Sequence, residues 1–355
     1  MSVEHFIAMD THCQTTDICV KTRANTPGRW VRVNTTIPEI RAVLEQVRRP
    51  RKLVFEEGPL ADWLWRNLAP SVDEALVCDP RKNALVAKDG DKDDPIDAGK
   101  LCDLFIGGYV RPVHHPETLG RQVAKQTVGL YHERVSARVR QANKVLGLLR
   151  RWGVMVKEQD FAAEADRPAV LARIGDGEEL QTVKAHVELL LRGYDEAVWE
   201  QTVLQRQVRQ LAQANEQVMR WCALPGIGPI RAMTLWVYLD TPGRFKSKAA
   251  LWKYLGIGLV REHSGSGREW VHVERGANRR LKGAILGAAQ SAIERGRIPS
   301  GSNIGGCWRR AYRPRTRGGR WRGGWPGCSG GCGKLAASTV LSKSGVAAEA
   351  ADSHG

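Results

Sequence analysis

The first hundred residues alternate between strand-like and helix-like segments, and this order limits the possible folds more than any other feature of the sequence. Short apolar runs bounded by Gly, Asn or Pro predict strands, and apolar residues at helical spacing predict helices. The expected strands cover residues 5–12, 15–22, 28–35, 51–57 and 74–79. The expected helices cover residues 37–49, 61–69 and a segment from Pro95 to about Phe105. This order predicts a mixed sheet flanked by helices, an α/β domain.

Acidic residues stand where these strands end and where the last of these helices begins. Asp10 ends the first strand, Glu56 or Glu57 ends the fourth, and Asp94 and Asp97 begin the helix. The element order fits a ribonuclease-H-like sheet, in which these places lie close together. Four carboxylates in one cleft repel unless cations neutralise them, and Mg²⁺ prefers oxygen ligands. Two such ions about 4 Å apart support phosphodiester cleavage, so the pattern predicts a magnesium site.

The same acids also have a purely structural interpretation. Asp94 followed by Pro95 and Asp97 is how an ordinary helix begins, with an N-cap, a proline at the first helical position and an acid facing the positive helix end. Each acid alone is more often structural than catalytic. The four in this order favour the catalytic interpretation.

A long helical region follows. Residues 117–152 are helical in pattern and rich in basic side chains, which form either a solvated face or a face that lies against nucleic-acid phosphates. Apolar positions then recur by sevens at Val183, Leu190, Ala197, Leu204, Leu211 and Val218, with a companion register at Val187, Tyr194, Gln201, Val208 and Asn215. The heptads predict a coiled coil or a long helical hairpin, which we interpret as an elongated arm that forms homodimers or higher homo-oligomers. The alternative is a long helix packed only within its own chain.

A short basic region comes next. In LPGIGPIRAMTLWVYL, Gly226 and Gly228 precede a helix that starts near Pro229, as in a helix-hairpin-helix unit whose glycines let backbone N–H groups approach a phosphate. The alternative is a plain tight turn. Residues 251–270 are expected to form a loop rich in Gly and Ser, followed by a basic amphipathic helix. The candidate nucleic-acid contacts on that helix are Arg279, Arg280 and Lys282.

The amino-acid composition indicates which class of binding partner is favoured. The 355 residues carry a formal net charge of +16, which favours a polyanion, nucleic acid before a membrane surface. No run of about twenty apolar residues is present. The N-terminus carries acids where a signal peptide would be basic, and none of the eight cysteines forms a CxxC pair. These features predict a cytoplasmic protein with reduced thiols.

The motifs taken together resemble the DEDD-type insertion-sequence transposases of bacteria and archaea. MDTH carries the first acid, FEEGP matches the Glu-x-Gly-Pro form and assigns Glu56, and KDDPIDA matches Lys-Thr-Asp-x-x-Asp-Ala and assigns Asp94 and Asp97. LPGIGPIRA and the SGSG loop match the family's C-terminal domain. The resemblance implies a RuvC-like domain, a magnesium-binding DEDD site and DNA cutting and rejoining.

The resemblance also implies a serine nucleophile and a guide RNA. In this family a serine of the C-terminal domain forms a covalent phosphoserine link with DNA, and the candidates here are Ser264 and Ser266. Spacing favours Ser264, although the family's Gly-Asn pair reads Gly276-Ala277-Asn278 in this chain. A structured RNA from the element's own non-coding end would choose the target by base pairing. Two other functions stay open: a RuvC-like junction nuclease without serine chemistry, and an inactive DNA-binding remnant.

The last part of the chain departs from the family pattern. From about Pro299 the sequence concentrates Gly, Arg and Trp without apolar periodicity, which indicates either a disordered RNA-binding tail or an out-of-frame ending. Codons permitted by residues 327–342, read two nucleotides further on, give Leu-Phe-Trp-Gly-Met-Trp-Lys-Thr-Gly-Gly-Glu-Tyr-Arg-Pro-Glu, which matches the family's ending. We therefore expect a frameshift between about Arg297 and Arg320. The expected domains are the DEDD domain at 1–115, the arm at 116–220, the C-terminal domain at 221–298 and the tail at 299–355.

Overall fold

The structure is a computed structural model that describes residues 3–80, 94–115, 118–263, 269–273 and 276–294. The chain forms two compact units, Met1–Glu117 and Thr118–Gly355. The expected tail and both candidate serines lie outside the described residues. Within the described part of the chain, no helix combines the length and the apolar character that a bilayer crossing requires.

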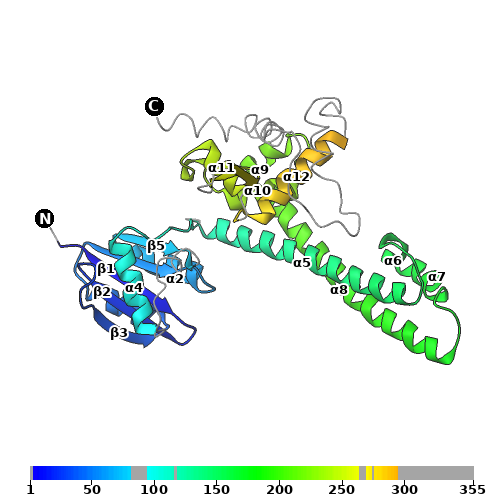
Figure 1. The fold of residues 1–355 in the computed structure, drawn as a ribbon, viewed down its shortest axis with the longest axis horizontal. Helices are drawn as coiled ribbons and strands as arrows, with labels where there is room; N and C mark the ends of the chain where they lie inside the picture. The colour runs from blue at the N-terminus through cyan, green and yellow to red at the C-terminus, as the bar shows by residue number, and fades with distance from the viewer. Residues whose placement is uncertain (1–2, 81–93, 116–117, 264–268, 274–275, 295–355) are drawn as a thin grey trace. The chain divides into compact units, whose positions relative to one another are not determined.

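The first unit is built on a five-stranded mixed sheet (Figure 1). Its strands are β1 (His5–Thr11), β2 (Thr15–Lys21), β3 (Arg29–Asn34), β4 (Arg51–Glu56) and β5 (Glu74–Cys78). They lie in the order β3-β2-β1-β4-β5. β1 pairs antiparallel with β2 and β2 with β3, whereas β1–β4 and β4–β5 are parallel. The parallel half therefore places the carboxyl ends of β1, β4 and β5 at one edge of the sheet.

Helices cover both faces of this sheet. They are α1 (Ile37–Glu45), α2 (Ala61–Leu68) and α4 (Asp94–Ile106), and a short 3₁₀ turn covers Ala69–Ser71. Successive strand residues point to opposite faces. In β1, Ile7 and Met9 pack in the cluster that contains residues of α1 and α2, and Ala8 packs in the cluster that contains residues of α4. Both faces of the central strand are therefore buried, which explains its continuous apolar run.

The second unit contains a long helical hairpin. Helices α5 (Leu119–Arg151) and α8 (Glu178–Gln213) lie side by side along their length (Figure 1). The short segments α6 (Gln159–Ala162), a 3₁₀ turn at Glu164–Asp166 and α7 (Arg167–Ala172) connect them. The hairpin is antiparallel, because Arg134 bonds Glu200 at 3.0 Å while Gly193 lies against Gln141.

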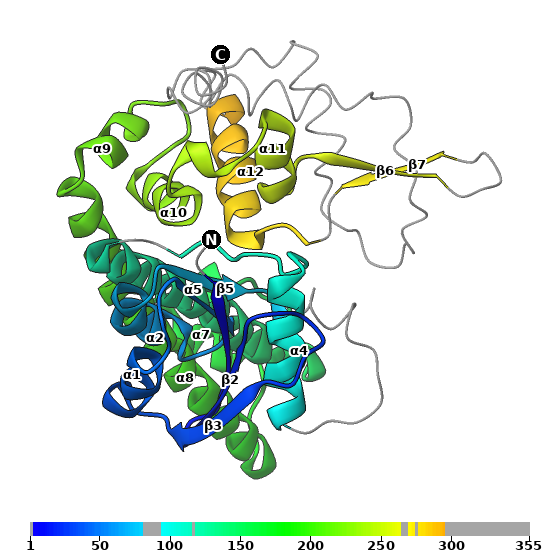
Figure 2. The same ribbon diagram turned by 90° about the vertical axis from the view of Figure 1, so that its left-hand side faces the viewer.

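A small helical body completes the described part of the second unit. It comprises α9 (Glu216–Cys222), α10 (Pro229–Leu239), a 3₁₀ turn at Pro242–Arg244, α11 (Lys248–Tyr254), the hairpin β6 (Leu259–His263)–β7 (Glu269–Val273) and α12 (Arg279–Glu294). Figure 2 shows the β6–β7 hairpin beside α11. One apolar cluster joins α9 to α12 with the N-terminal half of α5 and the C-terminal end of α8. This cluster fixes α10 and α12 against α5.

The structure confirms the expected order of strands and helices in the first unit and the helices that begin near Pro229 and Arg279. The expectation of a continuous loop over residues 251–270 is wrong for the described part of that range, because the end of α11, β6 and the start of β7 lie there; residues 264–268 lie outside the described residues. Among the described residues these two short strands pair only with each other, so the sequence lacks the long alternation that identifies a larger sheet.

Several residues of the heptad pattern pack against α5 of the same chain. Val183, Val187 and Tyr194 are buried in a cluster with residues of α5, and the side chain of Gln201 accepts a hydrogen bond from Arg138 Nε at 3.0 Å. Asn215 does not lie on a helical seam, since it caps α9 by accepting a hydrogen bond from the Val218 amide at 3.0 Å. Formation of homo-oligomers through the arm stays a prediction.

Candidate functional site

Two of the four predicted acids lie on neighbouring parallel strands. Met9 of β1 pairs with Phe55 of β4. Asp10 and Glu56 are the next residues of these two strands, so they lie side by side at the strand ends. Adjacent strands are about 4.8 Å apart. By alternation, Asp10 shares the sheet face of Ala8, and Glu56 shares that of Val54, which is the face covered by α4. Glu57 falls on the opposite face, so the geometry favours Glu56 as the acid beside Asp10.

The two carboxylates differ in exposure from ordinary core residues of these strands. The Asp10 side chain is 30 % exposed, and its Oδ2 lies 3.5 Å from Nε2 of His12, which follows in the turn to β2. Glu56 is exposed at the end of β4. Both are therefore within reach of solvent and of a ligand at the edge of the sheet, while the strands that hold them are fixed by a buried core.

The other two predicted acids lie in the first turn of α4. Asp97 is exposed, and Asp94 is the first residue of the helix, although its side chain is outside what the structure describes. Ala98 and Leu101 are buried in the same cluster as Ala8. Further along the helix, Cys102 donates a hydrogen bond to the Phe6 carbonyl at 3.4 Å, and the Phe105 ring stacks edge-on against Phe6 at 5.5 Å.

These contacts orient α4 on the sheet. Its last turns lie over Phe6, at the start of β1, and its buried middle lies over the centre of the sheet. The helix rises about 1.5 Å per residue, so its first turn lies roughly 16 Å before Phe105. The strand covers about 13 Å from Phe6 to Asp10. The first turn of α4 is thus directed toward the end of β1 that carries Asp10.

Sequence reasoning missed a third acid on this face. Asp17 of β2 pairs directly with Asp10 and is 4 % exposed. Arg32 of β3 donates two hydrogen bonds to its carboxylate, each at 2.9 Å. This bidentate pair neutralises a buried charge beside Asp10 and links β3 to β2. The short turn between the first two predicted strands could have indicated this acid, because a short hairpin places positions 10 and 17 opposite each other.

The chemistry of the donor set suits a hard divalent cation, but two described carboxylates do not complete a site. Among the described residues, no group of three or more His, Cys, Asp and Glu side chains is arranged to hold a metal ion. Asp10 and Glu56 supply oxygen ligands at one edge of the sheet. Asp97 is among the described residues and does not complete such a group with Asp10 and Glu56, whereas the Asp94 side chain lies outside them.

The predicted nucleophiles belong to the other unit. Ser264 and Ser266 lie between β6 and β7, outside the described residues, whereas the strands on either side pair antiparallel with His263 opposite Glu269. Downstream, the Asn278 side chain accepts hydrogen bonds from the amides of Arg280 and Leu281, at 3.0 and 3.2 Å. Asn278 therefore caps α12 and fixes the start of the helix that carries the predicted basic residues.

The two glycines of the predicted hairpin have different surroundings. Gly226 has φ +78°, and a Cβ placed on it would lie 2.0 Å from the carbonyl oxygen of Ala288 in α12. Gly228 caps α10 with φ −96° and has open space where its Cβ would be. Gly226 is thus required for packing α10 against α12, and only Gly228 has room for an approaching ligand.

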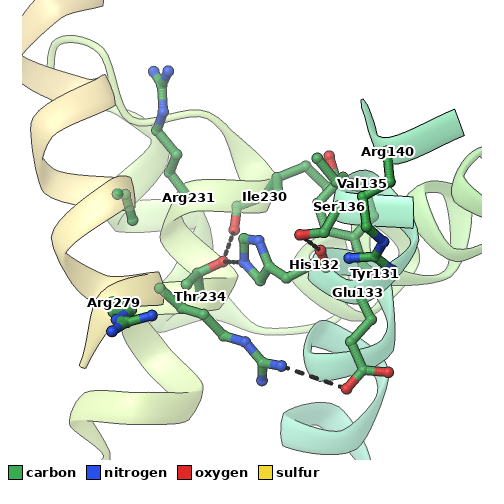
Figure 3. A pocket seen from close by; sticks show the side chains of 13 residues that line it. Tyr131, His132, Glu133, Val135, Ser136, Arg140, Ile230, Arg231, Thr234 and Arg279 are labelled. Atoms are coloured by element: carbon green, nitrogen blue, oxygen red, sulfur yellow. Dashed lines mark hydrogen bonds and ion pairs between the residues drawn. The ribbon is translucent and has the colours of Figure 1, made fainter. Parts of the chain in front are cut away.

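A basic cavity of about 570 Å³ lies between α5, α10 and α12 (Figure 3). Arg279 and Arg280, the candidate contacts of α12, line it together with Arg140 of α5, which belongs to the basic segment 117–152. Lys282 is half-buried and packs near Gly256 instead. Arg280 donates a hydrogen bond to the Tyr238 hydroxyl and lies 3.7 Å from Glu133.

A histidine contributes a neutral ring to this cavity. Burial, together with the positive charge of Arg280, lowers the pKa of His132 to about 4. The Thr234 hydroxyl donates to the Ile230 carbonyl at 2.8 Å, so it accepts the hydrogen bond from His132 Nε2 at 3.0 Å (Figure 3). The ring therefore carries its proton on Nε2 at neutral pH.

Comparisons with known proteins agree on one class. Residues 220–303 match the model of the IS116/IS110/IS902 transposase family. The chain is 26 % identical over 206 residues to a transposase of Sinorhizobium fredii and 26 % identical over 220 residues to a family 20 transposase of Pseudomonas aeruginosa. It is 22 % identical over 207 residues to the transposase of an insertion sequence element of Coxiella burnetii.

These matches cover 57 %, 58 % and 57 % of this chain and 51 %, 60 % and 55 % of the respective relatives. The chain therefore matches between about half and three-fifths of the length of these curated relatives. All three relatives are named as transposases, and residues 220–303 carry the similarity to the IS116/IS110/IS902 transposase family.

Proposed function

We propose that this chain is an insertion-sequence transposase that cuts and rejoins DNA with a magnesium-binding DEDD site formed by Asp10, Glu56, Asp94 and Asp97. The observation that carries the proposal is the juxtaposition of Asp10 and Glu56 at the carboxyl ends of two parallel strands, on the sheet face that α4 covers. The direction of α4 supports a contribution from its first turn. The arrangement agrees with a RuvC-like domain.

Each acid has a distinct part in holding the ion. Asp10 and Glu56 would be fixed ligands, because their strands are hydrogen-bonded to each other and packed on both faces. Asp94 would give one carboxylate oxygen to the helix start and the other to the ion, and Asp97 would add charge one turn on. When bound, Mg²⁺ would stabilise negative charge that develops on the reacting phosphate. The bidentate Arg32–Asp17 pair keeps the neighbouring buried carboxylate neutralised, so that Asp17 does not compete for the ion.

The nucleophile of the proposed reaction is Ser264, with Ser266 as the alternative. Its hydroxyl oxygen would form a bond to phosphorus while the bond from phosphorus to one deoxyribose oxygen breaks. The serine proton is lost and the departing oxygen takes up a proton, which leaves a free hydroxyl end and a phosphoserine link. The covalent link conserves the phosphodiester for rejoining. The assignment rests on the resemblance and its spacing, and the strands that flank the two serines in sequence are paired, with His263 opposite Glu269.

Target choice is proposed to rest on an RNA that pairs with DNA. The excess of basic residues and the exposed Arg140, Arg150 and Arg151 in the second half of α5 support contacts with phosphates, which carry no sequence information by themselves. A protein of this kind needs contacts to the shape and backbone of nucleic acid, while base pairing reads the sequence. Homo-oligomers are proposed as the active form.

The test uses the full-length protein with DNA of its element ends, magnesium and RNA transcribed from the element's non-coding flank. Denaturing gels should reveal a covalent protein–DNA adduct that chelation of magnesium abolishes. Ser264→Ala should remove the adduct, and Ser266→Ala should retain it; the reverse result would transfer the role to Ser266. Free 5′-phosphate ends without any adduct would instead identify a junction nuclease, and binding without cleavage would identify a DNA-binding remnant.

Substitution of the proposed ligands needs a control for the loss of one negative charge. Asp10→Asn and Glu56→Gln should abolish the adduct while leaving the folded protein and its nucleic-acid binding unchanged. Glu188→Gln removes an exposed carboxylate on α8 and should leave the adduct at the wild-type level. Adduct formation by Asp10→Asn at the wild-type rate would contradict the DEDD assignment.

A further inference from the structure

The cavity between α5, α10 and α12 is larger than an ion-binding site. Its volume of about 570 Å³ falls in the range of pockets that hold small organic molecules. It lies wholly within the second unit, and its walls come from three helices that share one apolar core. The pocket is therefore a stable feature of the fold.

The charges at this pocket select an anion. Arg140 and Arg279 are exposed and make no hydrogen bond or ion pair with any other described residue. Arg280 is oriented by the Tyr238 hydroxyl and by Glu133, whose Oε1 lies 3.7 Å away. Among the residues that line the pocket, Glu133 is the single carboxylate. The arginines exceed it in number, so an anionic ligand would be attracted.

The positions of the arginines suit two anionic groups separated by a neutral part. Arg279 begins α12 and Arg140 lies on α5, and the two stand on opposite sides of the pocket (Figure 3). Arg231 lines the pocket as well, but its guanidinium donates to the Gly226 carbonyl at 2.7 Å and to Ser291 at 2.9 Å. It therefore serves the packing of α10 on α12.

The lining also includes uncharged and partly apolar side chains. Among them are Tyr131, Ile230 and His132, whose Nε2–H is bonded to Thr234. An inorganic anion would leave this surface without a partner. A nucleoside within a strand is flanked by a phosphate on each side and presents an apolar ring face, and base rings stack favourably on aromatic side chains.

We propose that this pocket binds one unstacked nucleotide of a nucleic-acid strand, with its flanking phosphates on Arg279 and Arg140 and its sugar or base against Tyr131 and Ile230. The inference rests on the proposed function only in assuming that the protein binds nucleic acid. DNA and RNA share the recognised chemistry. The pocket accepts a single strand, because a paired base cannot leave its stack without breaking its pair.

The experiment measures fluorescence anisotropy of labelled single-stranded DNA and RNA oligonucleotides, and of the matching duplexes, with full-length protein over a range of salt concentrations. Ser136 is exposed on α5 at the pocket, and its hydroxyl bonds only within its own helix, to the His132 carbonyl at 3.0 Å. Ser136→Trp would fill the pocket without removing charge. Ser136→Ala is its control. Arg279→Ala and Arg140→Ala remove the phosphate contacts, and Arg192→Ala removes an exposed arginine elsewhere, on α8.

Single strands should bind more tightly than duplexes to the wild-type protein. Arg279→Ala and Arg140→Ala should each weaken single-strand binding by about tenfold and lower the salt slope by about 0.7. Ser136→Trp should weaken it by at least about tenfold, with Ser136→Ala and Arg192→Ala near the wild-type level. Preference for one of the two single strands would identify the source of the nucleotide.

Three results would overturn the inference. Unchanged binding by Ser136→Trp would mean that the arginines act as an open basic surface. Equal binding of duplex and single strand would exclude an unstacked nucleotide. Competition by poly-glutamate as strong as that by unlabelled oligonucleotide would assign the pocket to an acidic peptide. In each case a retained covalent adduct would leave the proposed function standing, whereas failure of all nucleic-acid binding would reject both.

Discussion

The two glycines of the sequence Gly226-Ile227-Gly228 allow a matched test of the structure. Gly226 has φ +78°, and an added Cβ would lie 2.0 Å from the Ala288 carbonyl oxygen, 2.8 Å from the Ala288 carbonyl carbon and 3.1 Å from the Ala292 nitrogen. All three atoms belong to the backbone of α12, so no side chain can rotate away. Gly226→Ala must therefore displace α12 or the turn.

The expected cost combines two terms. The positive φ costs an alanine about 1–2 kcal/mol, and overpacking against a fixed backbone typically costs about 1–3 kcal/mol more. The sum is roughly 2–5 kcal/mol. For a unit of this size, each kcal/mol lowers Tm by about 2–4 °C, so the unfolding transition of the second unit should fall by roughly 4–20 °C.

Gly228→Ala is the matched control. Gly228 has φ −96° and open space at its Cβ. Loss of a glycine N-cap costs a few tenths of a kcal/mol to about 1 kcal/mol, and reduced entropy of the unfolded chain offsets about 0.4–1 kcal/mol. We expect no more than a small shift in Tm, measured by differential scanning calorimetry. An equal Tm for Gly226→Ala and the wild-type protein would refute the packing of α10 against α12 described above.

Three further predictions concern other parts of the molecule. Arg32→Ala should lower the stability of the first unit by about 1–3 kcal/mol in urea denaturation, because it leaves the buried Asp17 carboxylate without the two hydrogen bonds that Arg32 donates to it. Asp17→Asn in the same chain should restore part of the loss, and no change on Arg32→Ala would contradict the pairing. The pKa of His132 in the folded protein is about 4, below its usual value of 6.5. Between these pH values the unfolded state binds more protons than the folded state. The free energy of unfolding should therefore decrease as the pH falls from about 6.5 to about 4. His132→Asn should decrease less over that window in parallel melting curves, whereas an identical decrease would place the proton uptake elsewhere. The nucleotide sequence of the gene should restore the family ending in another reading frame after a point between about Arg297 and Arg320, and intact coding of the tail would reject the frameshift; the family match ends at residue 303.

The first unit was predictable from sequence because its local signals agree with its tertiary structure. HFIAMDT alternates between two buried faces, and the turn residues around each strand mark its ends. The same regularity predicted that acids at strand ends would gather, and Asp10 and Glu56 do lie on adjacent strands. Asp17 was missed because its importance depends on the pairing of β1 with β2 and on Arg32 from a third strand.

In the second unit, the sequence patterns do not show which segment each residue packs against. Heptads predict a long apolar seam but not which helix covers it, and α5 of the same chain covers much of it. Asn215 falls in register with the heptads, although a break at Ala214 makes it the N-cap of α9. The motif that contains Gly226 suggests phosphate binding. The close approach of Ala288 depends on how α12 packs and could not be predicted from the sequence. The basic pocket likewise combines Arg140 with Arg279, which are far apart in the chain.

The most direct test of the account is magnesium-dependent strand cleavage of element-end DNA by the full-length protein and its Asp10→Asn variant, with Glu188→Gln as the charge control. Circular dichroism and anisotropy would first establish that all three fold and bind nucleic acid alike. The wild-type and Glu188→Gln proteins should cleave the DNA, and Asp10→Asn should not. Cleavage by Asp10→Asn at the wild-type rate would contradict the assignment of the reaction to the sheet edge that carries Asp10 and Glu56.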